Sequence, residues 1–260
     1  IVEIQLPSGK SRALIDETAE TFVFVYGNSF RHDTKGKKEI IWRSERDGWN
    51  HLYLYDGLTG KLKNQITQGK WVVREVLHVD EKRRQILFTA NGREKGMDPY
   101  YQQVYRIDFD GKNLVRLSEA DGTHSAELSP DKTVYIEKWS RVDQPPKHIL
   151  RRVKDGKALI TLEEADAKDL YATGWRHAER FVTKDRDGKF DIHGIICRPS
   201  NFDPKKKYPV VEVIYAGPHG SFVPKGWRSR YGHWRDELME LGFITVQIDG
   251  KGTNHRGREF

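Results

Sequence analysis

Three segments of the chain repeat the same order of strands and turns, and this repeat constrains the fold more than any other feature. The segments are residues 39–67, 85–118 and 133–164. In each, short runs of alternating apolar and polar residues flank an Asp-Gly pair, and both residues of such a pair tolerate the positive φ of a tight hairpin turn. The three pairs begin at Asp47, Asp110 and Asp155.

The spacing of the repeat is typical of β-propeller blades. The corresponding apolar positions Ile40, Ile86 and Val134 lie 46 and 48 residues apart, and blades repeat about every 40 to 50 residues. A propeller generally needs about four to eight blades, and three alone would leave strand edges unpaired. We therefore expect residues 1–165 to form the C-terminal part of a β-propeller, about three blades, completed by upstream blades or by another chain.

The pattern changes after residue 165. Residues 166–173 are interpreted as a linker, and residues 180–197 predict a hairpin that turns at Asp187-Gly188. The β-branched run at 210–214 predicts a central strand that is buried on both faces. Residues 243–248 predict a second buried strand.

A helix is expected between these two strands. Trp234, Leu238 and Leu241 have the spacing of one helix face, and Gly242 stands where a C-terminal cap would. A hairpin followed by a strand, a helix and a parallel strand is how many α/β sheets begin. We therefore expect residues 166–260 to form the N-terminal part of an α/β domain.

Composition excludes several classes of protein. The formal net charge is +7, but 45 basic residues are interleaved with 38 acidic ones, so we expect no nucleic-acid partner. The most basic stretch, residues 225–235, is interpreted as the exposed approach to the helix. The single cysteine, Cys197, excludes an intrachain disulfide and a cysteine-based zinc site. No apolar run approaches the roughly 20 residues of a membrane span.

The ten histidines are scattered and show no metal-binding spacing. His32, His51 and His193 are therefore predicted to be surface or turn residues, and no metal or organic cofactor is implied. The Gly250-Lys251-Gly252 motif is too short to indicate a phosphate loop. Asp249 ends the second strand, where a carboxylate could act as a general acid or base.

Tyr215 is the candidate site residue that follows from the strand pattern. It ends the run at 210–214 and is followed by Ala216, Gly217 and Pro218. In open α/β sheets, ligands bind at the carboxyl ends of the strands. The alternative is a packed aromatic residue at a strand end, with its hydroxyl satisfied by a neighbour.

Four stretches of the chain resemble the dipeptidyl peptidase IV branch of the prolyl oligopeptidase family of serine peptidases. They read SERDGWNHLYLYD, NFDPKKKYPVV, YAGPHGSFVPKGW and QIDGKGTNHRG. The resemblance runs from end to end and implies an eight-bladed propeller that caps an α/β-hydrolase domain. It also implies peptide substrates with a penultimate Pro or Ala, release of N-terminal dipeptides through an acyl-enzyme, and a parent protein that can be a homodimer.

The resemblance assigns two candidate site residues. Tyr215 matches the tyrosine that supplies the side-chain half of the family's oxyanion hole, and a phenol is protonated at neutral pH and can donate to a developing oxyanion. Removing one such donor typically costs about 2.7 to 4 kcal/mol of transition-state stabilisation. His219 lies in the loop that borders the family's active-site cavity and is the candidate for a contact with substrate. The position of Asp249 in the family pattern implies a structural turn aspartate.

The catalytic triad is not found in these 260 residues. An α/β-hydrolase carries its serine on a G-x-S-x-G elbow, followed by Asp and His, and no such elbow occurs here. Ser221 lacks the second glycine and follows the wrong strand. We therefore expect the chain to be a fragment of a larger peptidase, inactive by itself.

Two further expectations complete the sequence-based interpretation. The alternative function is a non-catalytic β-propeller scaffold that binds peptide or protein. The location is bounded weakly, because one cysteine fits a reducing cytoplasm and a bacterial periplasm equally well. The family resemblance favours a periplasmic or otherwise exported protein.

Overall fold

The computed structural model describes residues 1–23, 29–215, 217–227 and 234–260, and the side chains of 234–236 lie outside this description. Most of the basic stretch at 225–235 therefore falls outside the described residues. The chain divides into two compact units. Unit 1 comprises Ile1–Lys95, Gln103–Leu117 and Arg256–Glu259, and unit 2 comprises Gly96–Gln102, Ser118–His255 and Phe260.

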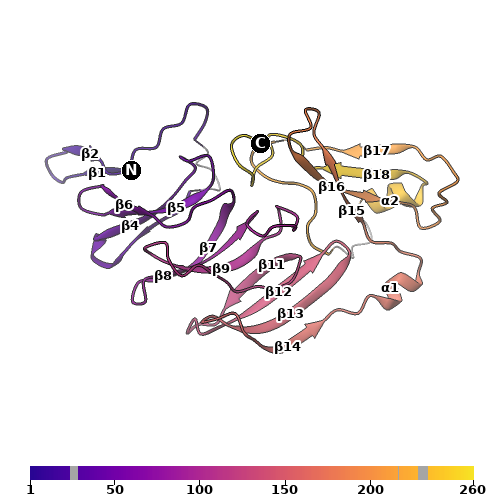
Figure 1. The fold of residues 1–260 in the computed structure, drawn as a ribbon, viewed down its shortest axis with the longest axis horizontal. Helices are drawn as coiled ribbons and strands as arrows, with labels where there is room; N and C mark the ends of the chain where they lie inside the picture. Colours follow the sequence, from indigo (N-terminus) through magenta and orange to yellow (C-terminus); the bar gives the residue numbers. More distant parts are fainter. Residues whose placement is uncertain (24–28, 216, 228–233) are drawn as a thin grey trace. The chain divides into compact units, whose positions relative to one another are not determined.

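Unit 1 contains two four-stranded antiparallel sheets and a short hairpin (Figure 1). The hairpin pairs β1 (Val2–Ile4) with β2 (Ser11–Ala13). The first sheet consists of β3 (Arg31–Asp33), β4 (Glu39–Ser44), β5 (His51–Asp56) and β6 (Leu62–Gln65), with a 3-10 turn, Lys35–Lys37, between β3 and β4. The second consists of β7 (Val72–Asp80), β8 (Gln85–Asn91), β9 (Gln103–Asp108) and β10 (Val115–Arg116). In both sheets the strands follow one another in chain order.

One buried cluster of aliphatic and aromatic side chains contains residues of both sheets of unit 1, among them Leu52 of β5 and Phe88 of β8. Trp71, Phe88 and Tyr105 are buried and stacked, with the rings of Phe88 and Tyr105 5.7 Å apart. His51 lies in the same core, with Nδ1 3.0 Å from the Thr67 hydroxyl and Nε2 2.8 Å from the Gly69 carbonyl oxygen. The prediction that His51 is a surface or turn residue is therefore wrong. Burial lowers its pKa, which favours a neutral ring that donates to the carbonyl.

Unit 2 begins with a third antiparallel sheet, also in chain order. It consists of β11 (Thr123–Leu128), β12 (Val134–Arg141), β13 (Gln144–Arg152) and β14 (Ala158–Glu164). A short helix, α1 (Lys168–Ala172), follows. Three four-stranded antiparallel sheets of this kind are consistent with propeller blades.

The repeat seen in the sequence maps onto these sheets with two differences. Ile40, Ile86 and Val134 each lie on the second strand of their sheet, as equivalent positions should. The Asp-Gly pairs are not equivalent: the pair at 47–48 joins the second and third strands, whereas those at 110–111 and 155–156 join the third and fourth. All three glycines have positive φ, between 73° and 89°, so each pair does form a tight turn.

The last part of unit 2 is a mixed sheet in the order β15-β16-β18-β17 (Figure 1). Its strands are β15 (Glu179–Lys184), β16 (Asp191–Cys197), β17 (Val210–Val213) and β18 (Ile244–Ile248), and α2 (Trp234–Glu240) lies between the last two in sequence. The predicted hairpin is confirmed as β15 and β16, and β17 pairs with β18 in parallel, as expected.

The prediction of a central, doubly buried strand at 210–214 is wrong for this structure. Among the described residues, β17 pairs only with β18 and forms the edge of the sheet. Val210 and Ile214 are 62% and 66% exposed. The β-branched run indicated a strand correctly, but β-branched residues favour the pleated backbone whether or not a second neighbour covers it.

The helix face is also shifted from the predicted one. Leu241 follows the end of α2 and is 74% exposed, whereas Met239 is buried. The side chain of Trp234 lies outside the described residues, and Leu238 is half-buried. Gly242 closes the helix as expected, with its N–H donated to the Met239 carbonyl at 2.9 Å.

Candidate functional site

Tyr215 lies directly beyond β17 with its side chain 56% exposed. His219 Nε2 lies 3.1 Å from the Tyr215 hydroxyl oxygen, and the two rings meet edge to face. The Phe222 ring packs against Tyr215 with 4.3 Å between ring centroids. The structure thus brings both sequence-predicted site residues, Tyr215 and His219, into direct contact, with Phe222 as a third ring.

A glycine makes this ring cluster sterically feasible. A Cβ at Gly217 would lie 2.4 Å from His219 Cε1 and 3.1 Å from Tyr215 Cε1. Both distances are shorter than an ordinary van der Waals contact. Any side chain at position 217 would therefore push His219 away from the tyrosine.

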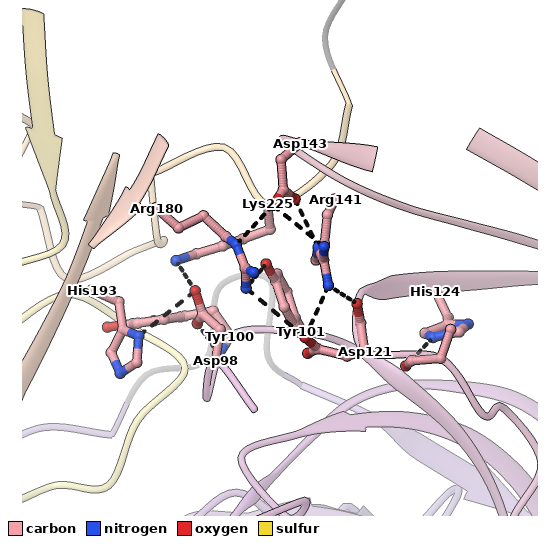
Figure 2. A network of polar contacts seen from close by, with 11 residues as sticks. Asp98, Tyr100, Tyr101, Asp121, His124, Arg141, Asp143, Arg180, His193 and Lys225 are labelled. Carbon is pink, nitrogen blue, oxygen red and sulfur yellow. Dashed lines mark hydrogen bonds and ion pairs between the residues drawn. The ribbon is translucent and has the colours of Figure 1, made fainter. Parts of the chain in front are cut away.

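The segment that follows this cluster is attached to loops of unit 2 by polar contacts (Figure 2). Lys225 Nζ lies 2.7 Å from the carboxylate of Asp98, which belongs to the loop between β8 and β9. The same ammonium lies 4.7 Å from the centre of the Tyr100 ring, within the range of a cation–π contact. His193 of β16 faces Asp98 as well, at 3.8 Å.

A second group of charges connects the third sheet to the hairpin of the mixed sheet (Figure 2). Arg141 Nε donates to Asp143 at 2.7 Å, and Arg180 Nε lies 3.5 Å from the same carboxylate. Arg141 also binds Asp121 at 3.0 Å, and Arg180 donates to the Tyr101 hydroxyl at 3.2 Å. Burial alone would raise the pKa of Asp143, but the two arginines outweigh it and hold the pKa below its usual value.

A cavity of about 440 Å³ lies beside these charges. Its walls include Asp98, Asp143, Arg180 and His193, together with the apolar side chains of Met97 and Phe181. Charges of both signs line it, and each acid is already paired with a base. The cavity therefore offers polar contacts without a single dominant charge.

The remaining sequence candidates have structural partners. Lys251 binds Asp187 and Asp185 at 2.6 and 3.0 Å. The lysine of the Gly-Lys-Gly motif is therefore already engaged in ion pairs. His32 contacts Glu81 at 2.9 Å and is partly exposed. In the described part of the chain, no three His, Cys, Asp or Glu side chains are grouped so that they could hold a metal ion.

The sequence did not predict the ion pairs of this region, such as Lys225 with Asp98 and Arg180 with Asp143. The members of the first pair lie 127 residues apart, and no local pattern marks them. The basic stretch that begins at Lys225 was interpreted as an exposed approach to the helix, whereas Lys225 itself is largely buried and paired with Asp98. Only the tertiary fold identifies such partners.

Among the described residues, no helix has the length and apolarity that a membrane span requires. The chain is 27% identical over 267 residues to the dipeptidyl peptidase 4 of Trichophyton rubrum. The aligned region covers 100% of this chain and 34% of the relative. The chain is 28% identical over 268 residues to the dipeptidyl peptidase 4 of Arthroderma otae, again over 34% of the relative.

A solved structure agrees with the sequence comparison. The crystal structure of Porphyromonas gingivalis dipeptidyl peptidase 4 matches 99% of this chain with a TM-score of 0.80 and 27% identity, over 35% of that chain. The chain thus spans about a third of the length of these relatives. Residues 1–146 match the family model described as the dipeptidyl peptidase IV N-terminal region, and the chain therefore belongs to the dipeptidyl peptidase IV family.

Proposed function

We propose that the protein containing this chain is a serine exopeptidase that releases N-terminal dipeptides after a penultimate Pro or Ala through an acyl-enzyme. In this proposal, residues 1–165 belong to the propeller and residues 166–260 begin an α/β-hydrolase domain. The observation that supports it most is the exposed side chain of Tyr215 at the carboxyl end of a strand in a mixed sheet. The relatives of the chain are named dipeptidyl peptidase 4.

The proposed role of Tyr215 is to donate a hydrogen bond to the oxyanion that forms when the nucleophile attacks the substrate carbonyl. An oxyanion develops its full charge only near the transition state, so a fixed donor there raises kcat more than it improves binding. His219 is proposed to contact the substrate beside this donor. Its contact with the Tyr215 hydroxyl supports a role next to the tyrosine.

The proposal requires catalytic residues that the 260-residue sequence does not contain. No G-x-S-x-G elbow occurs in it, so residues 1–260 alone are expected to lack peptidase activity. A sample with a measured mass near 30.3 kDa that hydrolyses a Gly-Pro or Ala-Pro anilide would contradict this expectation.

The experiment that tests the proposed function uses the full-length protein. We expect it to hydrolyse Gly-Pro and Ala-Pro anilides and to react with a fluorophosphonate, because only an activated serine is phosphonylated. Tyr215→Phe should lower kcat by about 10²- to 10³-fold, the usual effect of losing one oxyanion donor. A protein that neither hydrolyses these anilides nor reacts with the fluorophosphonate would instead be the non-catalytic scaffold.

The partners and location follow from the same proposal. Peptides with a free amino terminus and a penultimate Pro or Ala are the proposed ligands, and the protein is proposed to be exported and to dimerise. Fractionation of the native host and the mass of the full-length protein in solution would test these two points separately.

A further inference from the structure

Strand β18 and the residue after it, Asp249, carry a row of buried polar side chains beside β17. Thr245, Gln247 and Asp249 are 1%, 8% and 0% exposed. Since alternate residues of a strand point to the same side, these three side chains share one face. The apolar residues of the opposite face are only half-buried. Buried polar groups are normally hydrogen-bonded, because leaving them unpaired is costly, and Gln247 and Asp249 of this row have such partners.

Two members of this row hold the backbone of Phe222. The Asp249 carboxylate accepts the N–H of Phe222 at 2.7 Å with one oxygen and the N–H of Val223 at 3.2 Å with the other. Gln247 Nε2 donates to the Phe222 carbonyl at 2.9 Å. Three hydrogen bonds with Gln247 and Asp249 thus hold the backbone of Phe222 and Val223, which lie 25 to 27 residues earlier in the chain.

The Phe222 ring, whose backbone is held in this way, packs against both candidate site residues. Its ring centroid lies 4.3 Å from that of Tyr215 and 5.7 Å from that of His219. Tyr215 is 56% exposed, and its ring packs against His219 and Phe222. The Phe222 ring is therefore a principal contact that limits where the phenol can point.

The surroundings of Asp249 offset the burial of its carboxylate only in part. Burial raises the pKa of Asp249, while the two backbone N–H groups and the charge of Lys225 act in the opposite direction. Lys225 in turn is held by Asp98. A simple turn aspartate would lie at the surface and cap its own loop, whereas this one reaches back to a distant segment.

We propose that Asp249 is a positioning residue for Tyr215 and acts through Phe222. This inference rests on the proposed function, because its effect on Tyr215 matters only where the tyrosine stabilises a transition state. Asp249 itself touches no reacting atom. It sets the direction of the tyrosine hydroxyl by fixing the aromatic ring against which the tyrosine packs.

The test is a double-mutant cycle in the full-length protein with Ala-Pro anilide as substrate. Asp249→Asn keeps the size of the side chain but turns one accepting oxygen into a donor that faces a backbone N–H. We expect kcat to fall about 10- to 100-fold with little change in KM, the range expected for misplacing a catalytic group by about 1 Å. In the Tyr215→Phe background, the same substitution should lower kcat by less than about threefold, because its target is already gone.

A second cycle removes the ring and leaves the backbone bonds in place. Phe222→Leu should lower kcat in the same direction as Asp249→Asn and should likewise be non-additive with Tyr215→Phe. If Asp249→Asn does not fold, this cycle decides alone. Asp187→Asn, which breaks an exposed contact with Lys251, is the matched control and should stay within about twofold of the unsubstituted protein.

The outcomes separate the two proposals. If the unsubstituted protein releases no dipeptide, or Tyr215→Phe has no effect, the proposed function or the role of Tyr215 fails. If both behave as proposed but the two cycles are additive, Asp249 and Phe222 support only the fold and the positioning role is overturned.

Discussion

Lys225 Nζ lies 2.7 Å from Asp98 Oδ2, with both side chains largely buried. The segment after Tyr215 is therefore tied to a loop that precedes it by more than a hundred residues. Lys225→Met would leave the Asp98 charge without its main partner, and breaking a buried ion pair from one side typically costs about 3 kcal/mol or more. We expect Lys225→Met to lower the urea concentration at the midpoint of unfolding of the full-length protein, as measured by tryptophan fluorescence.

The control for this substitution is Lys112→Met, because Lys112 pairs with Asp110 on the exposed surface at 3.6 Å. Exposed pairs contribute little, so its urea midpoint should not move. Combining Lys225→Met with Asp98→Asn should recover part of the lost stability, since the unpaired charge is removed as well. Equal midpoints for Lys225→Met and Lys112→Met would contradict the structural importance of the buried pair.

Asp143 should make stability depend on pH in the acid range. Its two arginine partners hold its pKa below the usual value in the folded state, against the effect of burial. The folded state therefore binds this proton less readily than the unfolded chain does. The resulting stability is present above the usual aspartate pKa of about 3.9 and is lost as the pH falls through the lower folded value.

The measurement compares the unsubstituted protein with Asp143→Asn in urea titrations at several pH values. The difference in the free energy of unfolding between the two proteins should be largest near neutral pH and should shrink below about pH 4. Taking the difference removes the contribution of the other carboxylates. A difference that stays constant, or that grows as the pH falls, would show that Asp143 is not stabilised by Arg141 and Arg180.

Much of the secondary structure was predictable because it depends on local chemistry. The Asp-Gly turns, the second strand of each sheet and the helix end at Gly242 all follow from short patterns. The first strands were missed. Strand β7 pairs with β8 through two register shifts, between Val73 and Glu75 and between Val76 and His78. Each shift breaks the alternation by which a strand is recognised.

The candidate site was predictable only in part, for a related reason. Tyr215 could be singled out because a strand end followed by Gly217 is a local signal. Asp249 also ends a strand, but its partners lie 26 and 27 residues away, and periodicity carries no information about such contacts. The prediction for His51 was wrong because a polar residue in a strand usually faces solvent. Its two ring nitrogens instead have hydrogen-bond partners inside the core.

The third sheet contains a buried ionic centre that should be sensitive to substitution. Arg151 Nε lies 2.6 Å from Glu137 Oε2, and His124 Nδ1 lies 2.9 Å from the other oxygen. Both Glu137 and Arg151 are buried. Arg151→Met should cost about 3 to 5 kcal/mol, because the carboxylate stays buried without its guanidinium. Urea unfolding of the full-length protein measures the loss.

The neighbouring arginine supplies a matched control. Arg152 pairs with Asp155 within one exposed turn, so Arg152→Met should leave the midpoint nearly unchanged. Glu137→Gln combined with Arg151→Met should be more stable than Arg151→Met alone. If the double variant is the less stable of the two, the cost arises from lost packing of the arginine and not from an unpaired charge.

His219 is proposed to contact the substrate, and its place beside Tyr215 makes the test specific. His219→Ala removes a hydrogen-bonding group, which is typically worth about 0.5 to 1.5 kcal/mol. We expect KM for Ala-Pro anilide to rise about 2- to 10-fold in the full-length protein, with kcat changed less. The effect on KM should persist in the Tyr215→Phe background, because a substrate contact does not need the phenol. A loss confined to kcat that disappears in that background would instead assign His219 to holding the tyrosine hydroxyl, which lies 3.1 Å from its ring nitrogen.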